Sequence, residues 1–198
     1  MNFIAKFAAV SSALLVSACD VTPDATHSGF VTPTASGAIS TDINNAQTRV
    51  TNDGSGNGYS LQIGGHSDGD GGLKGVAGIL PTTAVGATVT GGNVEYVGRY
   101  NALTIRNITV SDNFASGTAA EETGAITLNA NFGTGKLTGG GGRLTVNGSI
   151  SGKKIGGGAN YDGVKTKLAG QIGADRAVGV FHGNTDSTIV VGGFIVNP

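Results

Sequence analysis

The stretch that decides the fold runs from Gly124 to Asn197 and reads GAITLNANFGTGKLTGGGGRLTVNGSISGKKIGGGANYDGVKTKLAGQIGADRAVGVFHGNTDSTIVVGGFIVN. Apolar and polar residues alternate in the runs ITLNANF, RLTVNGSI, KTKLAGQI, AVGVF and TIVVGGFIV. Gly, Asn or Asp separates each run from the next, and these residues tolerate the positive φ that tight turns need. This pattern predicts an antiparallel all-β meander. Because the last run reaches the end of the sequence, we expect it to close a sheet or barrel.

The composition agrees with a turn-dense β protein. The chain has 198 residues, of which 36 are Gly, and its net charge is -1. So much glycine indicates either disorder or frequent turns, and the Val, Ile, Leu and Thr between the glycines favour turns. The near-neutral charge, without a basic stripe interleaved with aromatic residues, argues against nucleic acid as a partner.

The N-terminus predicts a targeting segment over residues 1–18, MNFIAKFAAVSSALLVSA. Lys6 supplies the positive charge, and the apolar run that follows is too short to span a bilayer as a helix. The sequence VSAC at residues 16–19 resembles the bacterial lipobox. This resemblance implies cleavage before Cys19 and attachment of diacylglycerol to its sulfur, with palmitate-type acylation of the new amine. The alternative is an ordinary signal peptide followed by an incidental cysteine.

Cys19 is the single cysteine of the chain, which excludes an internal disulfide and a CxxC metal knuckle. Two or three acyl chains give stable anchoring, so we expect membrane attachment at Cys19 in the bacterial cell envelope, at the outer membrane. Asp20 resembles an inner-membrane retention signal of enteric bacteria, which leaves the choice of membrane open. Residues 19–47, rich in Thr, Ser, Ala and Pro, predict an extended tether. Residues 48–80 predict short strands that pack on or join the barrel.

Residues 52–58, NDGSGNG, partly match a calcium loop. Asp53, Ser55, Asn57 and Gly58 occupy its first, third, fifth and sixth positions. The twelfth position, which should be a bidentate Glu, is Gly64. We therefore expect a hairpin turn here, and predict no metal and no cofactor.

Residues 65–69, GHSDG, match the G-x-S-x-G nucleophile elbow of esterases, with Ser67 as the nucleophile. Asp162 or Asp175, followed by His182, gives the chain order of a catalytic triad. The elbow requires a helix directly after the serine, and DGDGGLKG cannot start one cleanly. We therefore predict that the protein is not an enzyme, keep an esterase as a minor alternative, and expect His66 and His182 on loops or on the sheet surface.

Three further stretches indicate structural elements and not a binding or catalytic site. The sequence GTGK at residues 133–136 is followed by Leu137, not by the Ser or Thr of a phosphate-binding loop. The pair Glu121-Glu122 lies in a polar stretch, Ser111 to Thr123, that we expect to be a solvated loop. Residues 102–110, ALTIRNITV, alternate well, with a shift near Asn107 that predicts a bulge.

Several sequence segments resemble motifs of one protein family. NFGTGKLTG at residues 131–139 is similar to a recurring strand and turn of the transferrin-binding protein B type of β-barrel domain. VNGSISG at residues 146–152 resembles the strand that follows it, and GVFHG (179–183) with VGGF (191–194) resembles the closing hairpin. The resemblance covers Pro81 to Pro198, and more weakly Thr48 to Leu80. It extends to complement-regulator-binding surface lipoproteins, and such proteins are commonly lipid-anchored.

The resemblance implies an antiparallel, up-and-down β-barrel of eight strands with a filled interior over residues 81–198. The sequence GNTDST at residues 183–188 replaces the family motif between the two closing strands, so that motif is degenerate. Because transferrin-binding proteins are much longer, the resemblance transfers the fold and not transferrin binding.

Three functions stay open. The first is a non-enzymatic lipoprotein that binds a protein or small ligand through barrel loops, for which we expect the loops Ser111–Thr123, Gly64–Gly72 and Gly156–Asp162. The second is a structural or envelope-adaptor lipoprotein without a soluble ligand. The third is the esterase that uses Ser67.

Overall fold

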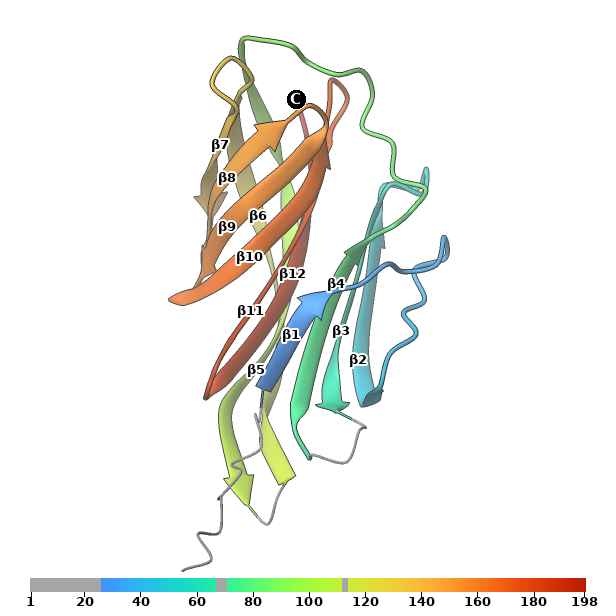
Figure 1. The fold of residues 1–198 in the computed structure, drawn as a ribbon, viewed down its shortest axis with the longest axis vertical. Helices are drawn as coiled ribbons and strands as arrows, with labels where there is room; N and C mark the ends of the chain where they lie inside the picture. The colour runs from blue at the N-terminus through green and yellow to red at the C-terminus, as the bar shows by residue number, and fades with distance from the viewer. Residues whose placement is uncertain (1–25, 67–70, 112–113) are drawn as a thin grey trace, which may run out of the picture.

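A computed structural model describes residues 26–66, 71–111 and 114–198 (Figure 1). These residues form twelve β-strands and no helix, which confirms the expected all-β class. Accordingly, the described residues contain no helix long and apolar enough to cross a membrane. The predicted signal peptide and Cys19 lie outside the described residues, as does Ser67.

The C-terminal strands close into an antiparallel barrel, as expected. Its order is β10-β11-β12-β5-β6-β7-β8-β9, and β9 pairs with β10. The final strand pairs with β5, so the last strand of the chain does close the barrel. The bounds are β5 (Asn93–Ser111), β6 (Phe114–Asn131), β7 (Lys136–Gly141), β8 (Leu144–Ser151), β9 (Lys154–Tyr161), β10 (Val164–Ile172), β11 (Ala177–Thr185) and β12 (Thr188–Asn197).

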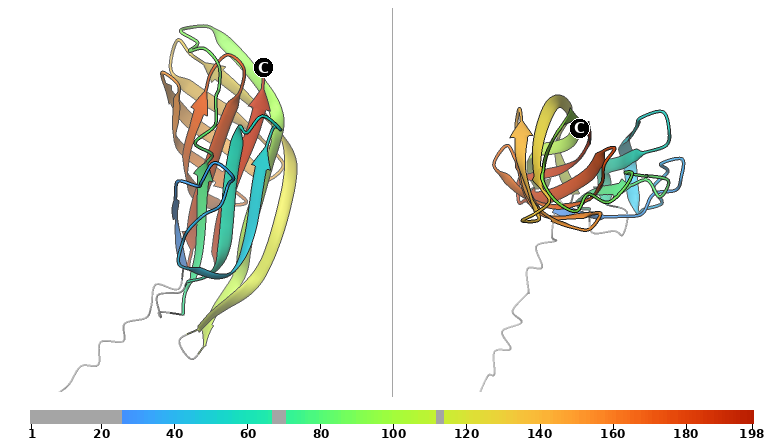
Figure 2. Two further views of the ribbon diagram at one scale, coloured as in Figure 1. Left: turned by 90° about the vertical axis from the view of Figure 1, so that its right-hand side faces the viewer. Right: turned by 90° about the horizontal axis from the view of Figure 1, so that it is seen from above.

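A smaller sheet lies against the outer wall of the barrel, on one side of the ring that the barrel strands form when seen from above (Figure 2). Its order is β1-β4-β3-β2, and β1 pairs with β4 in parallel. The other pairs in this sheet are antiparallel. The bounds are β1 (Thr26–Phe30), β2 (Ile43–Asn52), β3 (Gly58–His66) and β4 (Leu73–Ile79).

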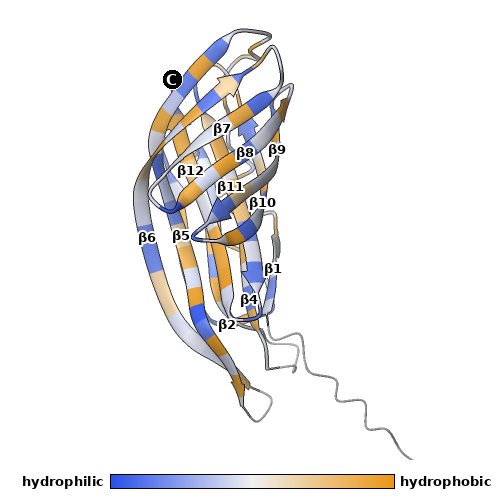
Figure 3. Cartoon of the chain, turned by 90° about the vertical axis from the view of Figure 1, so that its left-hand side faces the viewer, coloured by the Kyte–Doolittle hydropathy of each residue, from blue (hydrophilic) through white to orange (hydrophobic). Residues whose placement is uncertain are grey.

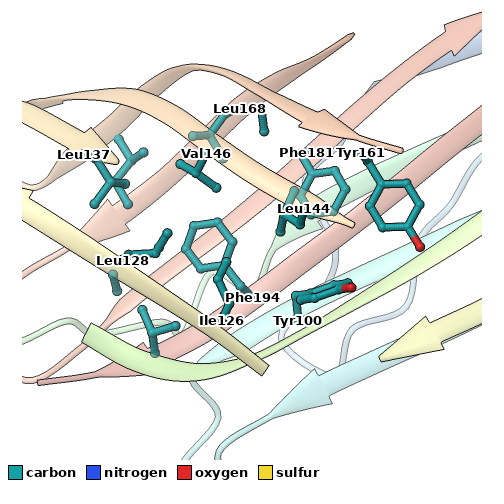
Figure 4. Close-up of a cluster of buried hydrophobic side chains, with 14 of the residues drawn as sticks. Tyr100, Ile126, Leu128, Leu137, Leu144, Val146, Tyr161, Leu168, Phe181 and Phe194 are labelled. Atoms are coloured by element: carbon teal, nitrogen blue, oxygen red, sulfur yellow. The ribbon is translucent and has the colours of Figure 1, made fainter. Parts of the chain in front are cut away.

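Side chains fill the barrel interior, as expected for a barrel of this size. Four aromatic rings from different strands point inward, and aliphatic side chains from the neighbouring strands pack around them (Figure 4). The ring centroids of Tyr161 and Phe181 are 6.1 Å apart in a stacked arrangement, and those of Tyr100 and Tyr161 are 6.3 Å apart edge to face. Aromatic pairs favour both geometries.

A second core lies between the barrel wall and the small sheet. Strand β12 shows how one sequence serves both cores: Val190 and Phe194 are in the interior cluster, whereas Ile189 and Val191 are in the second cluster with Tyr59 of β3. Successive side chains of a strand point to opposite faces. A strand that is apolar on both faces, such as TIVVGGFIV, therefore belongs where the barrel wall is covered from outside.

Glycines on the barrel wall make room for the buried rings. Gly192 lies opposite Phe181, and Gly179 lies opposite Phe194, in the pairing of β11 with β12. A Cβ on Gly192 would lie 2.6 Å from Phe181 Cε2, and closer still to Cζ. Each ring therefore lies over the bare backbone of the opposite strand, an arrangement in which an aromatic side chain covers a strand glycine.

Three expected regions differ from the structure. The tether expected over residues 19–47 already contains β1 and the beginning of β2, because β1 completes the small sheet by pairing with β4. The loops expected over Ser111–Thr123 and Gly156–Asp162 are mostly strand, in β6 and β9, because barrel neighbours pair with both. Of Gly64–Gly72, residues 64–66 end β3, and residues 67–70 lie outside the described part. The expected bulge near Asn107 is confirmed: the register of β5 shifts there, and Asn107 has φ 53°.

Candidate functional site

The barrel wall has an open edge along strand β6. Pairing between β6 and β7 runs from Asn131 to Thr127, and β7 then ends at Gly141. Strand β6 extends much farther, and within the described part of the chain its residues 114–126 pair with β5 alone. In Figure 1 this part of the β5–β6 hairpin (yellow-green) projects below the shorter strands β7 to β10. One side of β6 thus carries a ladder, and the other side is an edge.

The direction of the backbone groups on this edge follows from two contacts. The N–H of Ala115 donates to the carbonyl of Gly71 at 2.7 Å, and so it points away from β5. The carbonyl of Ala125 likewise points toward β7, where it lies against Gly141. Every second residue of an antiparallel strand directs its N–H and C=O to the same side. The residues between these two that face the open edge are therefore Gly117, Ala119, Glu121 and Thr123.

After Phe114, the side chains along this edge are small and uncharged up to Ala120. The sequence from Phe114 is FASGTAA, and all of these residues except Ala115 are exposed. Natural sheet edges are commonly protected by charged residues, proline or bulges. The outer edge of β2 has such protection, with a register shift between Asn44 and Gln47 and with Arg49 beyond it. Over FASGTAA, strand β6 carries no charged residue and no proline; the bulge of its partner β5 lies opposite Gly117, and Gly71 covers the N–H of Ala115 alone among the described residues.

Packing holds the hairpin in place under this edge. Ile105 and Ile108 of β5 are buried in the second core. The bulge at Asn107 keeps both of them on the core side, opposite Gly117 of β6. A Cβ on Gly117 would lie 2.6 Å from Ile105 Cγ2, so a glycine is needed where the hairpin crosses this core. The edge is therefore presented by a fixed scaffold.

An ion-pair cluster joins the β7–β8 and β9–β10 turns to strands β5 and β6. Arg143 lies 3.2 Å from both Glu122 and Asp162, and Asp162 lies 2.9 Å from Arg106. Tyr100 donates a hydrogen bond of 2.8 Å to Glu122. Burial, followed by this hydrogen bond, raises the pKa of Tyr100. Two arginines thus face two carboxylates, so the cluster itself carries no net charge.

A groove of about 400 Å³ lies between β2 and the barrel wall. Arg49, Arg99 and Asn101 line it, and it reaches β6 at Thr123. Asn101 Oδ1 accepts a 2.8 Å hydrogen bond from buried Tyr59, whose pKa is raised to about 12 chiefly by burial. Arg49 forms a 3.4 Å ion pair with Glu121 of β6. The groove therefore offers guanidinium and amide donors beside the open edge.

His182 connects the barrel to the small sheet. It is buried on β11, not on a loop or surface as expected, and its Nδ1 lies 2.9 Å from Ser28 Oγ of β1. Ser28 in turn donates to Asn184 Oδ1 at 2.8 Å. Burial, aided by the charge of Lys167, lowers the pKa of His182 to about 4, so the imidazole is neutral at pH 7. These contacts fasten β1 to the barrel.

His66 lies at the end of β3, and its side chain is only 6% exposed, not on a loop or the sheet surface as expected. Its Nε2 is 2.7 Å from Asp42 Oδ2, and Lys74 Nζ is 2.8 Å from Asp42 Oδ1. The hydrogen bond from Lys74 is the main reason why the pKa of Asp42 falls to about 2. The group is an ion pair that joins the loop before β2 to strands β3 and β4.

The described residues form neither a metal site nor a contact between His182 and the two aspartates of the esterase alternative, whose Ser67 lies outside them. Asp53 Oδ1 accepts hydrogen bonds from the N–H groups of Ser55 and Asn57, and Asp53 Oδ2 pairs with Arg176, so residues 52–58 form the expected turn. Within the described ranges, no group of His, Cys, Asp and Glu side chains could hold a metal ion. No hydrogen bond there joins His182 to Asp162 or Asp175. The open edge of β6 was missed from the sequence, because pairing between distant strands leaves no local signal.

The fold defines the class of protein: a closed eight-stranded barrel with a small sheet on its outer wall. No protein-family model matches the chain, and no curated protein matches it. Solved structures that are similar to it include a surface lipoprotein, with 17% identity, a TM-score of 0.49, and coverage of 76% of this chain and 81% of that chain.

Another similar structure is transferrin-binding protein B from Actinobacillus pleuropneumoniae, with 15% identity, a TM-score of 0.48, and coverage of 79% of this chain and 80% of that chain. A third is HpuA from Kingella denitrificans, in complex with human haemoglobin, with 12% identity, a TM-score of 0.29, and coverage of 81% and 91%. The expected similarity to the transferrin-binding protein B type of barrel is thus found among solved structures, as a likeness of fold.

Proposed function

We propose that this chain is a lipid-anchored protein of the bacterial cell envelope that binds an extended polypeptide segment along β6, without catalysing a reaction. The open edge of β6, with its uncharged and exposed side chains, is the observation that carries this proposal. An extended peptide that adds to a sheet edge gains main-chain hydrogen bonds, and neighbouring pockets select its alternate side chains. The groove beside Thr123 is such a pocket, and its Arg49 and Arg99 favour an acidic or amide side chain.

The proposed binding surface is the edge of a strand, whereas the sequence led us to expect barrel loops. Several connections between barrel strands are tight turns, such as those between β8 and β9 and between β11 and β12. Short turns offer little contact area, whereas a strand edge offers a row of backbone donors and acceptors. The rigid hairpin under the edge lowers the entropy that binding would otherwise lose.

A pair of variants at one position tests the binding mode. Ala119 directs its N–H to the open edge, so Ala119→Pro removes one donor and places a ring where a ligand strand would lie. Ala119→Val keeps the donor and the strand. Lipidated protein in detergent is used to select binders from a displayed library of short random peptides. We expect the selected peptides to bind the wild type and Ala119→Val, and to lose binding to Ala119→Pro.

Hydrogen exchange gives an independent measurement of the same contact. With a selected peptide bound, we expect slower exchange at the amides of Gly117, Ala119 and Glu121. Peptides that bind Ala119→Pro as well as the wild type would show that the edge is not the site. A library that yields no binders would favour the envelope-adaptor alternative, in which β6 has no soluble ligand.

The membrane anchor is tested separately. We expect palmitate labelling of the wild type, loss of the label in Cys19→Ser, and accumulation of the precursor when lipoprotein processing is inhibited with globomycin. A label that persists in Cys19→Ser would contradict anchoring at this residue. Protease treatment of intact cells then distinguishes the two faces of the outer membrane, because only a surface-exposed domain is removed.

A further inference from the structure

The end of the β5–β6 hairpin carries exposed apolar side chains. Phe114 at the start of β6 is 72% exposed, and Val110 near the end of β5 is 50% exposed. Val110 pairs with Ala115, whereas Phe114 pairs with Ser111. Neighbouring positions of a strand face opposite sides, so the hairpin end is apolar on both of its faces. Figure 3 shows apolar colour at this end of the hairpin.

Two contacts place this end beside the beginning of the described chain. Thr26, the first residue of β1, donates a hydrogen bond of 3.2 Å to the carbonyl of Thr185. The N–H of Ile108 in the hairpin donates to the carbonyl of Ser187 at 3.1 Å. Both acceptors belong to the short connection between β11 and β12 and its flanks, so Thr26 and Ile108 lie on the same end of the molecule, as Figure 1 shows for β1 and the hairpin.

The length of chain between Cys19 and Thr26 then limits how far a membrane can be from this end. Thr26 is seven residues after Cys19. A chain of that length spans at most about 25 Å, whatever its conformation. The hairpin continues for three residues from Ile108 to Ser111, or about 10 Å of extended strand toward the same side. The projecting hairpin end therefore lies within reach of any bilayer to which Cys19 is attached.

We infer that the hairpin end, through Phe114 and Val110, inserts into the interface of the membrane that holds the lipid anchor. This inference rests on the proposed anchor at Cys19, and it names the lipid surface as the partner of these side chains. Lipid can contact the apolar side chains on both faces of the hairpin end, because it surrounds an inserted segment. A protein partner would instead bind to one flat apolar face. With the acyl chains of Cys19 as one attachment and the hairpin as another, the domain is held in one orientation.

Single tryptophan probes test this contact, because the chain contains no Trp. Phe114→Trp places the probe on β6 at the hairpin end, and Val97→Trp places a control probe on the neighbouring strand β5, near the end away from the hairpin turn, where Val97 is 52% exposed. The lipidated full chain is reconstituted in phosphatidylcholine vesicles, with or without bromine on the acyl chains. We expect blue-shifted emission and bromine quenching for the Trp at position 114, and neither change for the Trp at position 97. Adding Val110→Asp to Phe114→Trp should reduce the quenching.

Failure of the membrane contact and failure of the lipid anchor give different results in this experiment. Protein that floats with the vesicles, but shows no quenching at position 114, overturns the membrane contact and leaves the anchor in place. Protein that does not float refutes the anchor, and the inference with it. Emission that is blue-shifted, insensitive to bromine and dependent on protein concentration shows that a second copy covers the hairpin end, which also overturns the inference.

Discussion

The substitution Gly192→Ala tests whether the aromatic rings in the barrel depend on bare backbone. The added Cβ would lie 2.6 Å from Phe181 Cε2, and closer to Cζ. Carbon atoms pack at about 3.5 to 4.0 Å, so the ring would have to move by about 1 Å. Phe181 is fully buried and stacks on Tyr161, so no empty space receives it.

The expected cost follows from the size of this overlap. Overpacking a buried site costs about 1 to 3 kcal/mol, and we expect about 3 kcal/mol because the obstacle is a ring with buried neighbours. For a domain of this size, the melting temperature falls by about 2 to 4 °C per kcal/mol, so Gly192→Ala should lower it by roughly 6 to 12 °C. Urea unfolding and calorimetry measure both quantities.

A glycine of β9 supplies the control. A Cβ on Gly156 meets only Ser149 Oγ, at 3.9 Å, and Gly156 has no positive φ. Gly156→Ala should therefore be neutral, or stabilising by up to about 1 kcal/mol. Adding Phe181→Leu to Gly192→Ala should recover part of the loss, because the two sites are coupled. If Gly192→Ala behaves like Gly156→Ala, the ring does not depend on the glycine and the explanation of the barrel interior fails.

Three further predictions concern pH, the sheet edge and the ion pairs. Folded His182 has a pKa of about 4, against 6.5 for an ordinary histidine. As the pH falls from 6.5 to 4, the unfolded chain therefore binds a proton at this residue and the folded chain does not. The free energy of unfolding should drop by up to about 3 kcal/mol over this range. Urea unfolding at a series of pH values checks this, and His182→Gln should remove that part of the slope. Ala119→Pro should leave stability nearly unchanged, because the N–H of Ala119 faces the open edge. Ala120→Pro should cost at least about 1 kcal/mol, because the proline removes a hydrogen bond with β5. Equal losses of the two variants in thermal unfolding would contradict the assigned edge. Asp162→Asn should cost less than about 1 kcal/mol at ordinary salt, since its ion pairs are partly exposed, and a larger, salt-independent loss would show that the cluster supports the barrel.

The strands that the sequence predicts are those with apolar residues at every second position. The runs that begin at Arg143, Lys165, Ala177 and Thr188 lie in β8, β10, β11 and β12 or begin one residue before them, and ITLNANF ends β6. Strands β7 and β9 show no alternation, because glycines occupy so many of their positions. Strand β7 was recognised only through the resemblance of NFGTGKLTG to a known barrel, and most of β9 was expected to be a loop, Gly156–Asp162.

The candidate site was much harder to predict. The stretch from Ser111 to Thr123 contains small and polar residues without alternation, and so it reads as a loop. Its residues from Phe114 to Thr123 form strand because β5, which alternates well, pairs with them. That β7 stops at Gly141 and leaves this part of β6 unpaired depends on the relative lengths of two strands. Neither strand contains that information alone.

The parallel pairing of β1 with β4 determines how the protein responds to mechanical load. In a chain anchored at Cys19, tension between the membrane and a bound partner enters the domain at Thr26 and runs along β1. The five registered pairs from Thr26 to Phe30 then resist sliding together, and do not open one after another as they would in a strand peeled from its end. The hydrogen bonds that join Ser28 and Thr26 of β1 to Asn184 of the barrel add to the same resistance. In such an anchored chain, β1 is thus loaded in shear along its parallel pairing with β4.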